Sequence, residues 1–211
     1  AVALTALLYA VVAFLVDTPR IFYDELIYME AAASFAAGEG LEVRGGAYAY
    51  GPLYPVVIAP LVAIAGDREA AYALVKVVNA LLFALTAVPV YLLARRLLEP
   101  SPSVVVAVLS ILIPSSVYVT VVMTESLAYL VFACALLAIV LALERPTAWR
   151  QLGALVLIGL AILARAQFLL LYAAFLAALV VAQVLLPQRR ELRWRGLAGL
   201  WPAAASVAAG V

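Results

Sequence analysis

Apolar and polar positions fall in long blocks along the chain, without the short period of an amphipathic helix or strand. Apolar runs rich in Leu, Ala and Val occupy residues 1–16, 70–98, 103–122, 125–143, 152–164, 168–186 and 196 onward. Most of these runs approach the length that a helix needs to cross a bilayer. Long continuous runs also favour helices over a barrel, because lipid leaves no other partner for backbone groups. The pattern predicts an all-α, polytopic membrane protein with about seven transmembrane helices.

The longest polar stretch, residues 17–51, follows the first apolar run. Its middle, residues 24–37, predicts a helix that ends at the glycine-rich breaker Gly38-Glu39-Gly40. Residues 52–65 are apolar but short, which suits an interfacial or re-entrant segment better than a full crossing. We therefore expect an exterior first loop that carries juxtamembrane helices. Residues 1–211 are expected to form a single domain, as a fragment of a longer chain.

Composition agrees with a membrane protein and narrows the chemistry. The chain is 69% hydrophobic and 12% charged, as expected for an integral membrane protein, and its net charge is +1. The net charge says nothing about nucleic acid, and no nucleic-acid partner is expected. It contains no histidine, which excludes a histidine-based dyad or zinc site within this chain. The single cysteine, Cys134, lies inside an apolar run and excludes an internal disulfide.

The charged residues divide between alternate loops. Arginines such as Arg95, Arg96 and Arg190 gather on one set, and these loops are expected to face the cytoplasm. Most acids lie on the other set, so the loop with Asp24 and Glu25 is expected outside. One lysine against many arginines is typical of a GC-rich genome, which favours a bacterium or archaeon and therefore a location in its plasma membrane.

Asp24 and Glu25 are the first candidate site residues, because a chain with so few charges places them together beside a membrane helix. Neighbours on a helix point about 100° apart, so both cannot face one pocket equally. Acids at a helix start also stabilise the helix dipole, and that alternative stays open.

Glu125 and Arg165 lie on the same predicted side of the membrane. A carboxylate at the start of an apolar helix is a candidate for function because its desolvation is costly, although it could simply cap the helix. Arg165 follows a run too short to span, so it is expected to line a cavity, where its guanidinium suits a phosphate. Snorkelling to the interface is the alternative for Arg165.

Further polar groups lie on this side: Arg44 in the first loop, Lys76 early in the second crossing, and Tyr48, Tyr50 and Tyr54. The tyrosines form either an interfacial belt or a sugar-binding surface. Carboxylates, cations and tyrosines beside lipid favour group transfer from a lipid-linked phosphosugar. A carboxylate can take the proton from an attacking hydroxyl, and a phosphate leaving group needs only positive charge nearby.

Several blocks in order resemble the GT-C glycosyltransferases, especially the protein O-mannosyltransferase and aminoarabinose transferase branch. They are DELIYMEAAASFAAGEGL, YGPLYPVVIAPLVAIAG, LVKVVNALLFALTAVPVYLLARRL, MTESLAYLVFACALLAIVLAL and GLAILARAQFLLL. The resemblance implies a cell-envelope glycosyltransferase with a polyprenyl-phosphate sugar donor, an exterior active site and Asp24 as base. It also implies that Glu125 is a second acid and Arg165 a ligand of the donor phosphate.

The resemblance leaves some features open. Some branches bind a divalent metal with such acids, so Asp24 and Glu125 are candidate ligands of Mg²⁺ or Mn²⁺. The acceptor is a glycan, a lipid or a protein. Family members are usually longer, which keeps a non-catalytic GT-C-like subunit as an alternative. A transporter or lipid flippase that uses Asp24, Glu25 or Glu125 for ion coupling is a further alternative.

Overall fold

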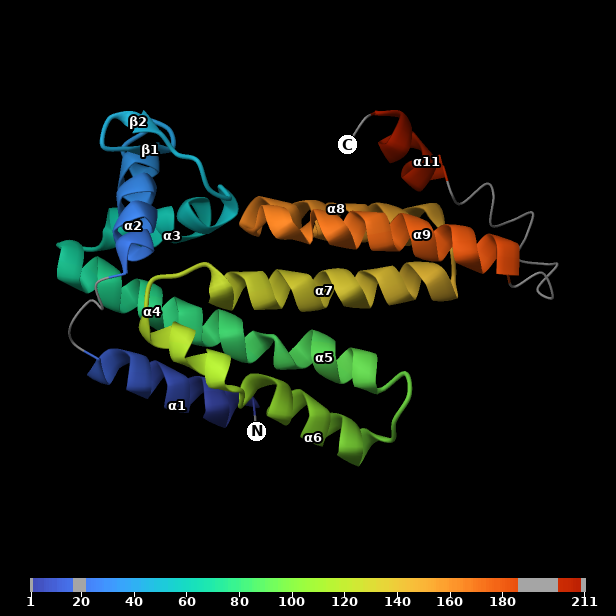
Figure 1. Cartoon of the computed structure of the whole chain (residues 1–211). Helices are drawn as coiled ribbons and strands as arrows, with labels where there is room; N and C mark the ends of the chain where they lie inside the picture. Colours follow the sequence, from blue (N-terminus) through green and yellow to red (C-terminus); the bar gives the residue numbers. More distant parts are fainter. Residues whose placement is uncertain (1, 17–21, 186–200, 210–211) are drawn as a thin grey trace. The chain divides into compact units, whose positions relative to one another are not determined.

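The computed structural model describes residues 2–16, 22–185 and 201–209, and it confirms the all-α class (Figure 1). The helices follow one another as α1 (Val2–Leu15), α2 (Tyr23–Ala36), α3 (Leu53–Ile64), α4 (Arg68–Leu85), α5 (Ala87–Ala94), α6 (Pro100–Ile111), α7 (Glu125–Glu144), α8 (Ala148–Ala164), α9 (Leu169–Leu185) and α11 (Trp201–Ala208). Two 3₁₀ segments, η1 (Pro114–Thr120) and η2 (Ala166–Phe168), separate α6 from α7 and α8 from α9.

In the part of the chain that the structure describes, helices of membrane-spanning length are fewer than the expected seven. Two segments of the described chain, Arg68–Ala94 and Glu125–Glu144, are long and apolar enough to cross a bilayer. The pair α6 and η1 adds a third if its 57° bend lies within one span. The other apolar helices have 10–17 residues, and the start of the expected last run lies outside the described residues. Seven crossings are therefore not shown, because breaks at residues such as Pro114 shorten the helices that apolar runs suggest.

The first loop contains the helix that its sequence predicts, followed by a small hairpin. Helix α2 ends before Gly38 and Gly40, whose φ angles of 82° and 89° stop a helix at no steric cost. Strands β1 (Glu42–Val43) and β2 (Gly46–Ala47) then pair antiparallel. Arg44 and Gly45 form the turn between them with φ angles of 53° and 74°, as a two-residue hairpin requires.

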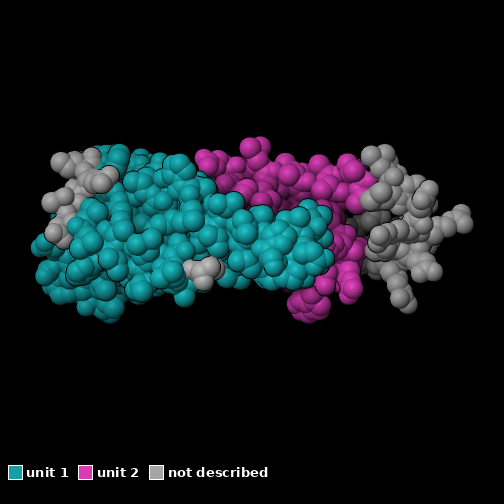
Figure 2. All heavy atoms as spheres, turned by 90° about the horizontal axis from the view of Figure 1, so that it is seen from below, with its two compact units in different colours: residues 1–130, 163–165 teal, residues 131–162, 166–211 magenta. Residues whose placement is uncertain are grey.

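Contacts divide the chain into two compact units, which Figure 2 colours separately: residues 1–130 with 163–165, and residues 131–162 with 166–211. Helix α7 begins in the first unit and continues into the second. The single-domain expectation for residues 1–211 stays a prediction. All of the candidate site residues belong to the first unit.

The first unit has its core where α1, α4, α5, α6 and η1 meet. This core contains Tyr9, Ala80, Phe83, Ala87, Ala107, Ile111 and Val119. The Tyr9 hydroxyl donates a hydrogen bond to the Ile111 carbonyl, which the break at the end of α6 leaves without a helical partner. Helix α2 packs on α3, and α3 packs on α4, so the first loop is attached to the same core.

The second unit has separate contacts of its own. The Phe132 and Phe168 rings lie 5.2 Å apart, and the Tyr172 hydroxyl and Ser206 Oγ are 2.9 Å apart. Gln151, near the start of α8, is fully buried. None of the sequence-predicted site residues falls in this unit.

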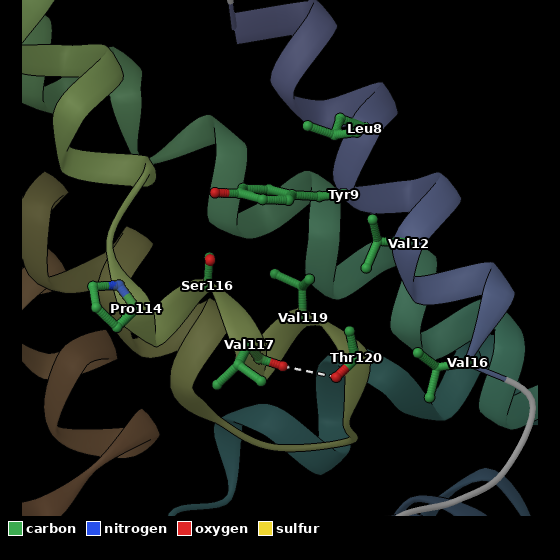
Figure 3. Close-up of a pocket in the computed structure, with 9 residues that line it drawn as sticks. All are labelled: Leu8, Tyr9, Val12, Val16, Pro114, Ser116, Val117, Val119 and Thr120. Carbon is green, nitrogen blue, oxygen red and sulfur yellow. Dashed lines mark hydrogen bonds between the residues drawn. The ribbon is translucent and has the colours of Figure 1, made fainter.

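An apolar cavity of about 340 Å³ lies between α1 and η1 in the first unit. Figure 3 shows Leu8 and Val12 of α1 facing Val119 of η1 across it. Thr120 Oγ1 is turned to the Val117 carbonyl at 2.8 Å. None of the predicted site residues lines this cavity.

Candidate functional site

The two neighbouring carboxylates of α2 have different surroundings. Glu25 is 2% exposed and accepts hydrogen bonds from the Tyr72 hydroxyl at 2.8 Å and from the Val122 backbone N–H at 3.2 Å. These contacts join α2 to α4 and to the segment before α7. Asp24 is half-buried and makes no hydrogen bond or ion pair with a described residue. Of the pair, Asp24 is therefore the carboxylate without a hydrogen-bond partner among the described residues, whereas Glu25 is bonded to α4 and to the segment before α7.

Four tyrosines from α2, the following loop and α3 form a cluster beside Asp24. The Tyr28 ring is at its centre, with ring centroids 6.5 Å from Tyr48, 6.2 Å from Tyr50 and 5.3 Å from Tyr54, all edge to face. Tyr28 lies one helical turn after Asp24, which places both on the same side of α2. The cluster therefore gives the Asp24 carboxylate an aromatic wall.

The ionisation of Tyr28 shows which groups surround its hydroxyl. Burial raises the pKa of Tyr28 most, and the neighbouring Thr124 hydroxyl lowers it. The carboxylates of Asp24 and Glu125 raise this pKa further, and the Arg165 guanidinium lowers it. Side chains from α2, the start of α7 and the end of α8 are thus close enough to Tyr28 to influence its ionisation.

Glu125 and Arg165 form an ion pair. Arg165 Nη2 lies 2.9 Å from Glu125 Oε1, and the exposed fractions of the two side chains are 36% and 10%. A fully exposed pair contributes little, whereas burial of the carboxylate makes its guanidinium partner necessary. Arg165 follows the end of α8 directly, where the chain turns into η2. The guanidinium is therefore anchored at one nitrogen and open on its other side.

Three side-chain oxygens at the start of α7 are buried without a hydrogen-bond partner among the described residues. They are Thr124 Oγ1, Glu125 Oε2 and Ser126 Oγ. Buried polar atoms in native proteins nearly always have partners, so this group requires an explanation. In the sequence, these oxygens are indicated only by the polar triplet Thr124-Glu125-Ser126 inside an apolar run.

At Gly51, the loop that carries Tyr48 and Tyr50 lies directly against the backbone at the end of α8. A Cβ atom built on Gly51 would lie 2.6 Å from the Leu163 carbonyl oxygen and still closer to that of Ala164. The φ angle of Gly51 is not in the left-handed region, so space alone requires a glycine here. This close approach brings the loop with Tyr48 and Tyr50 to the chain that carries Arg165, and no pattern in the sequence predicts it.

The other two predicted cations, Lys76 and Arg44, contact residues outside the tyrosine cluster. The buried Lys76 ammonium donates to the Val16 carbonyl at the end of α1 and lies 5.0 Å from the Tyr72 ring centroid. The Arg44 guanidinium lies 5.6 Å from the Tyr23 ring centroid, at the outer hairpin.

The two tyrosines predicted to contact substrate differ in exposure. Tyr54 is fully buried, and its hydroxyl is hydrogen-bonded to Asn79, with Tyr54 Oη to Asn79 Nδ2 at 2.9 Å. Tyr50 is 49% exposed. Tyr50 is therefore the one of the two that solvent reaches readily.

The role of Asp24 and Glu125 as metal ligands stays a prediction. Among the described residues, no group of three or more His, Cys, Asp or Glu side chains is placed to hold an ion. Two carboxylates can still suit Mg²⁺, which proteins commonly bind through one or two carboxylates together with substrate phosphates. The chemistry below is derived from the protein side chains.

A family model described as dolichyl-phosphate-mannose-protein mannosyltransferase matches residues 49–205. The matched part contains Tyr50, Tyr54, Lys76, Glu125 and Arg165, and it begins after the acids of α2. Searches of curated proteins and of solved structures find no match to this chain. The match covers most of the chain, and its apolar helices agree with an integral membrane protein of the glycosyltransferase class. The chain therefore belongs to the dolichyl-phosphate-mannose-protein mannosyltransferase family, which is of the GT-C type.

Proposed function

We propose that this protein transfers a sugar from a polyprenyl-phosphate donor to an acceptor hydroxyl with inversion, and that Asp24 is the catalytic base. Family membership supports sugar transfer of the mannosyltransferase type from a lipid-linked donor. The apolar helices provide lipid-facing surface for the donor, as in other membrane proteins. The acceptor is a glycan, a lipid or a protein.

The observation that carries this proposal is the position of Asp24. Its carboxylate has no partner among the described residues, yet it acts on Tyr28 together with Glu125 and Arg165. A base must be unoccupied and close to the groups that bind the reacting molecule. Of the two acids at the start of α2, Asp24 alone meets this requirement.

In this mechanism the acceptor oxygen attacks the anomeric carbon of the donor sugar. Asp24 accepts the hydroxyl proton as the new glycosidic bond forms, and the bond to the phosphate breaks on the opposite face. The polyprenyl phosphate leaves with the bonding electron pair. One displacement therefore inverts the anomeric configuration.

Arg165 is proposed to bind the donor phosphate. Its guanidinium has five N–H donors and spends one nitrogen on Glu125, so it can still present a fork to phosphate oxygens. This positive charge stabilises the leaving group as it develops. Glu125, the proposed second acid, holds Arg165 in place. Lys76 and Arg44 are proposed as further positive charges on this side. Tyr50 is proposed as the aromatic residue that faces the sugar, with the buried Tyr54 supporting it through the Tyr28 ring.

We further propose that the site faces outward from a bacterial or archaeal plasma membrane. The support is the distribution of arginines, which favours a cytoplasmic location for loops such as residues 187–195. The loop with α2 then lies on the opposite side. Labelling of a cysteine introduced at the exposed Glu39 position by a membrane-impermeant reagent in intact cells tests this orientation.

The decisive experiment compares wild type with Asp24→Asn, in purified protein supplied with polyprenyl-phosphate sugars and an acceptor extract. We expect transfer by wild type and a loss of about 10²-fold or more in the variant, because general base catalysis contributes that much. Glu39→Gln is the matched control, since this exposed acid is outside the tyrosine cluster. Equal activity in wild type and Asp24→Asn removes Asp24 as base, and uptake into proteoliposomes without sugar transfer supports the transporter alternative.

A further inference from the structure

Two oxygens at the start of α7 have no use in the mechanism so far. Glu125 Oε2 and Thr124 Oγ1 are buried, and neither has a hydrogen-bond partner among the described residues. Their residues are only 8% and 2% exposed. Leaving a carboxylate oxygen and a hydroxyl dry and unpartnered is unfavourable, so the protein gains when a ligand supplies the missing hydrogen bonds.

The neighbourhood of these atoms indicates what kind of ligand would do so. The Tyr28 hydroxyl lies near both side chains, and its interaction with the Thr124 side chain lowers the pKa of Tyr28. A carboxylate oxygen accepts hydrogen bonds, whereas a serine, threonine or tyrosine hydroxyl both donates and accepts. A wall of tyrosine rings stands beside this polar group. Hydroxyl groups on a compact ring match that mixture of acceptors, hydroxyls and aromatic surface.

We propose that Glu125 and Thr124 form the subsite for hydroxyl groups of the donor sugar, which makes Glu125 a specificity-determining residue. This inference rests on the proposed function. It assigns Glu125 a direct contact with substrate in addition to its bond with Arg165. Tyr28 closes the same subsite from α2.

The ion pair with Arg165 leaves one oxygen of Glu125 for a ligand. Arg165 Nη2 lies 2.9 Å from Glu125 Oε1, whereas Glu125 Oε2 has no hydrogen-bond partner among the described residues. Sugar hydroxyls can therefore donate charge-assisted hydrogen bonds to Oε2 while Arg165 stays on Oε1 and presents its other N–H groups to the donor phosphate.

The consequence for specificity is large. A site built to hydrogen-bond a hydroxyl group discriminates against an analogue that lacks it, because its own polar groups are then left unpaired. For a hydrogen bond to a charged group, the expected loss in kcat/KM is about tenfold to about 150-fold. A carboxylate acting only as a proton donor or as an anchor for Arg165 would not distinguish between sugar hydroxyls.

The test measures kcat/KM for the polyprenyl-phosphate sugar that wild type uses and for each of its monodeoxy analogues. Wild type should lose about tenfold or more with at least one analogue, and Glu125→Gln should shrink that loss by about tenfold. Thr124→Val should also reduce the discrimination, whereas Thr124→Ser, which keeps the hydroxyl, should retain it. Arg165→Gln should weaken all of the donors alike and leave the discrimination in place.

Two results overturn the subsite. One is a wild-type enzyme that accepts every monodeoxy analogue equally. The other is a Glu125→Gln variant that is folded by size-exclusion chromatography and slows all of the donors by the same factor. Absence of transfer from any polyprenyl-phosphate sugar by wild type would instead overturn the proposed function, and the subsite with it.

Discussion

Replacement of Gly51 by alanine tests whether the close approach between the tyrosine loop and the end of α8 holds the site together. The added Cβ would lie 2.6 Å from the Leu163 carbonyl oxygen and closer still to that of Ala164. Real Cβ atoms essentially never lie within 3.0 Å of such a neighbour, so the two backbone segments must separate. Backbone on both sides makes the shift costly, because no flexible side chain can give way.

The size of the effect follows from known overpacking costs. Insertion of a methyl group into a closed contact destabilises a protein by about 1–3 kcal/mol. For a chain of this size, each kcal/mol lowers the melting temperature by about 2–4 °C. The shift would separate Tyr48 and Tyr50 from the chain at Arg165. We therefore expect a large loss of transfer activity together with a modest fall in melting temperature. A misplacement of about 1 Å can cost about 10²-fold in rate.

The matched control is Gly66→Ala, where a Cβ atom meets nothing within 4 Å and φ is not positive. Thermal unfolding in detergent and transfer assays should show a lower melting temperature and activity for Gly51→Ala, with both near wild type for Gly66→Ala. If Gly51→Ala melts and turns over like the control, the close approach does not exist as described, and Gly51 plays no part in placing Arg165.

Three other substitutions and one titration test separate features. Asn79→Leu removes both Nδ2 donors, at 2.9 Å to Tyr54 Oη and 3.0 Å to the Val121 carbonyl, and the unpaired groups should cost roughly 2–5 kcal/mol in thermal unfolding. Asp67→Ala removes the bond to the Ala70 N–H at 2.8 Å that caps α4, and should cost about 1 kcal/mol; an unchanged melting temperature would contradict this capping role. Tyr72→Phe removes one hydrogen bond to Glu25 and should lower the melting temperature while leaving the KM for the sugar donor unchanged. A rise in this KM without a fall in melting temperature would show that Glu25 contacts substrate. Burial raises the pKa of Tyr48 above its ordinary value of 10.0, so alkaline absorbance titration should find tyrosines that ionise late, and stability should decline as pH rises beyond about 10, where the unfolded chain ionises first.

The sequence predicted the local structure of the first loop well. Residues 24–37 were expected to be helical, and α2 spans Tyr23–Ala36 with the glycine breaker directly behind it. Such features depend on residues close together in the chain, because a glycine permits the positive φ that ends a helix. The length of an apolar run likewise indicates whether a segment lies in a membrane. The hairpin of β1 and β2 was not predicted, because two-residue strands carry almost no pattern.

The number of crossings shows the limit of counting apolar residues. Run 103–122 is predicted as one crossing broken at Pro114, and the structure divides it there into α6 and η1 with a bend of 57°. Composition reports that a segment is apolar, whereas the path of the backbone depends on how each turn packs against its neighbours. Whether such a segment crosses the membrane was therefore beyond the sequence.

By itself, the sequence determined the class of this protein: a helical membrane chain without histidine chemistry, whose few charged groups had to be candidates for function. Only the tertiary structure decided which of two adjacent acids is anchored, since Glu25 meets Tyr72 and the Val122 N–H while Asp24 stays open. It also joined Glu125 to Arg165 across 40 residues of chain. Periodicity and composition describe neighbours along a helix, and contacts of this range arise only when separate helices pack together.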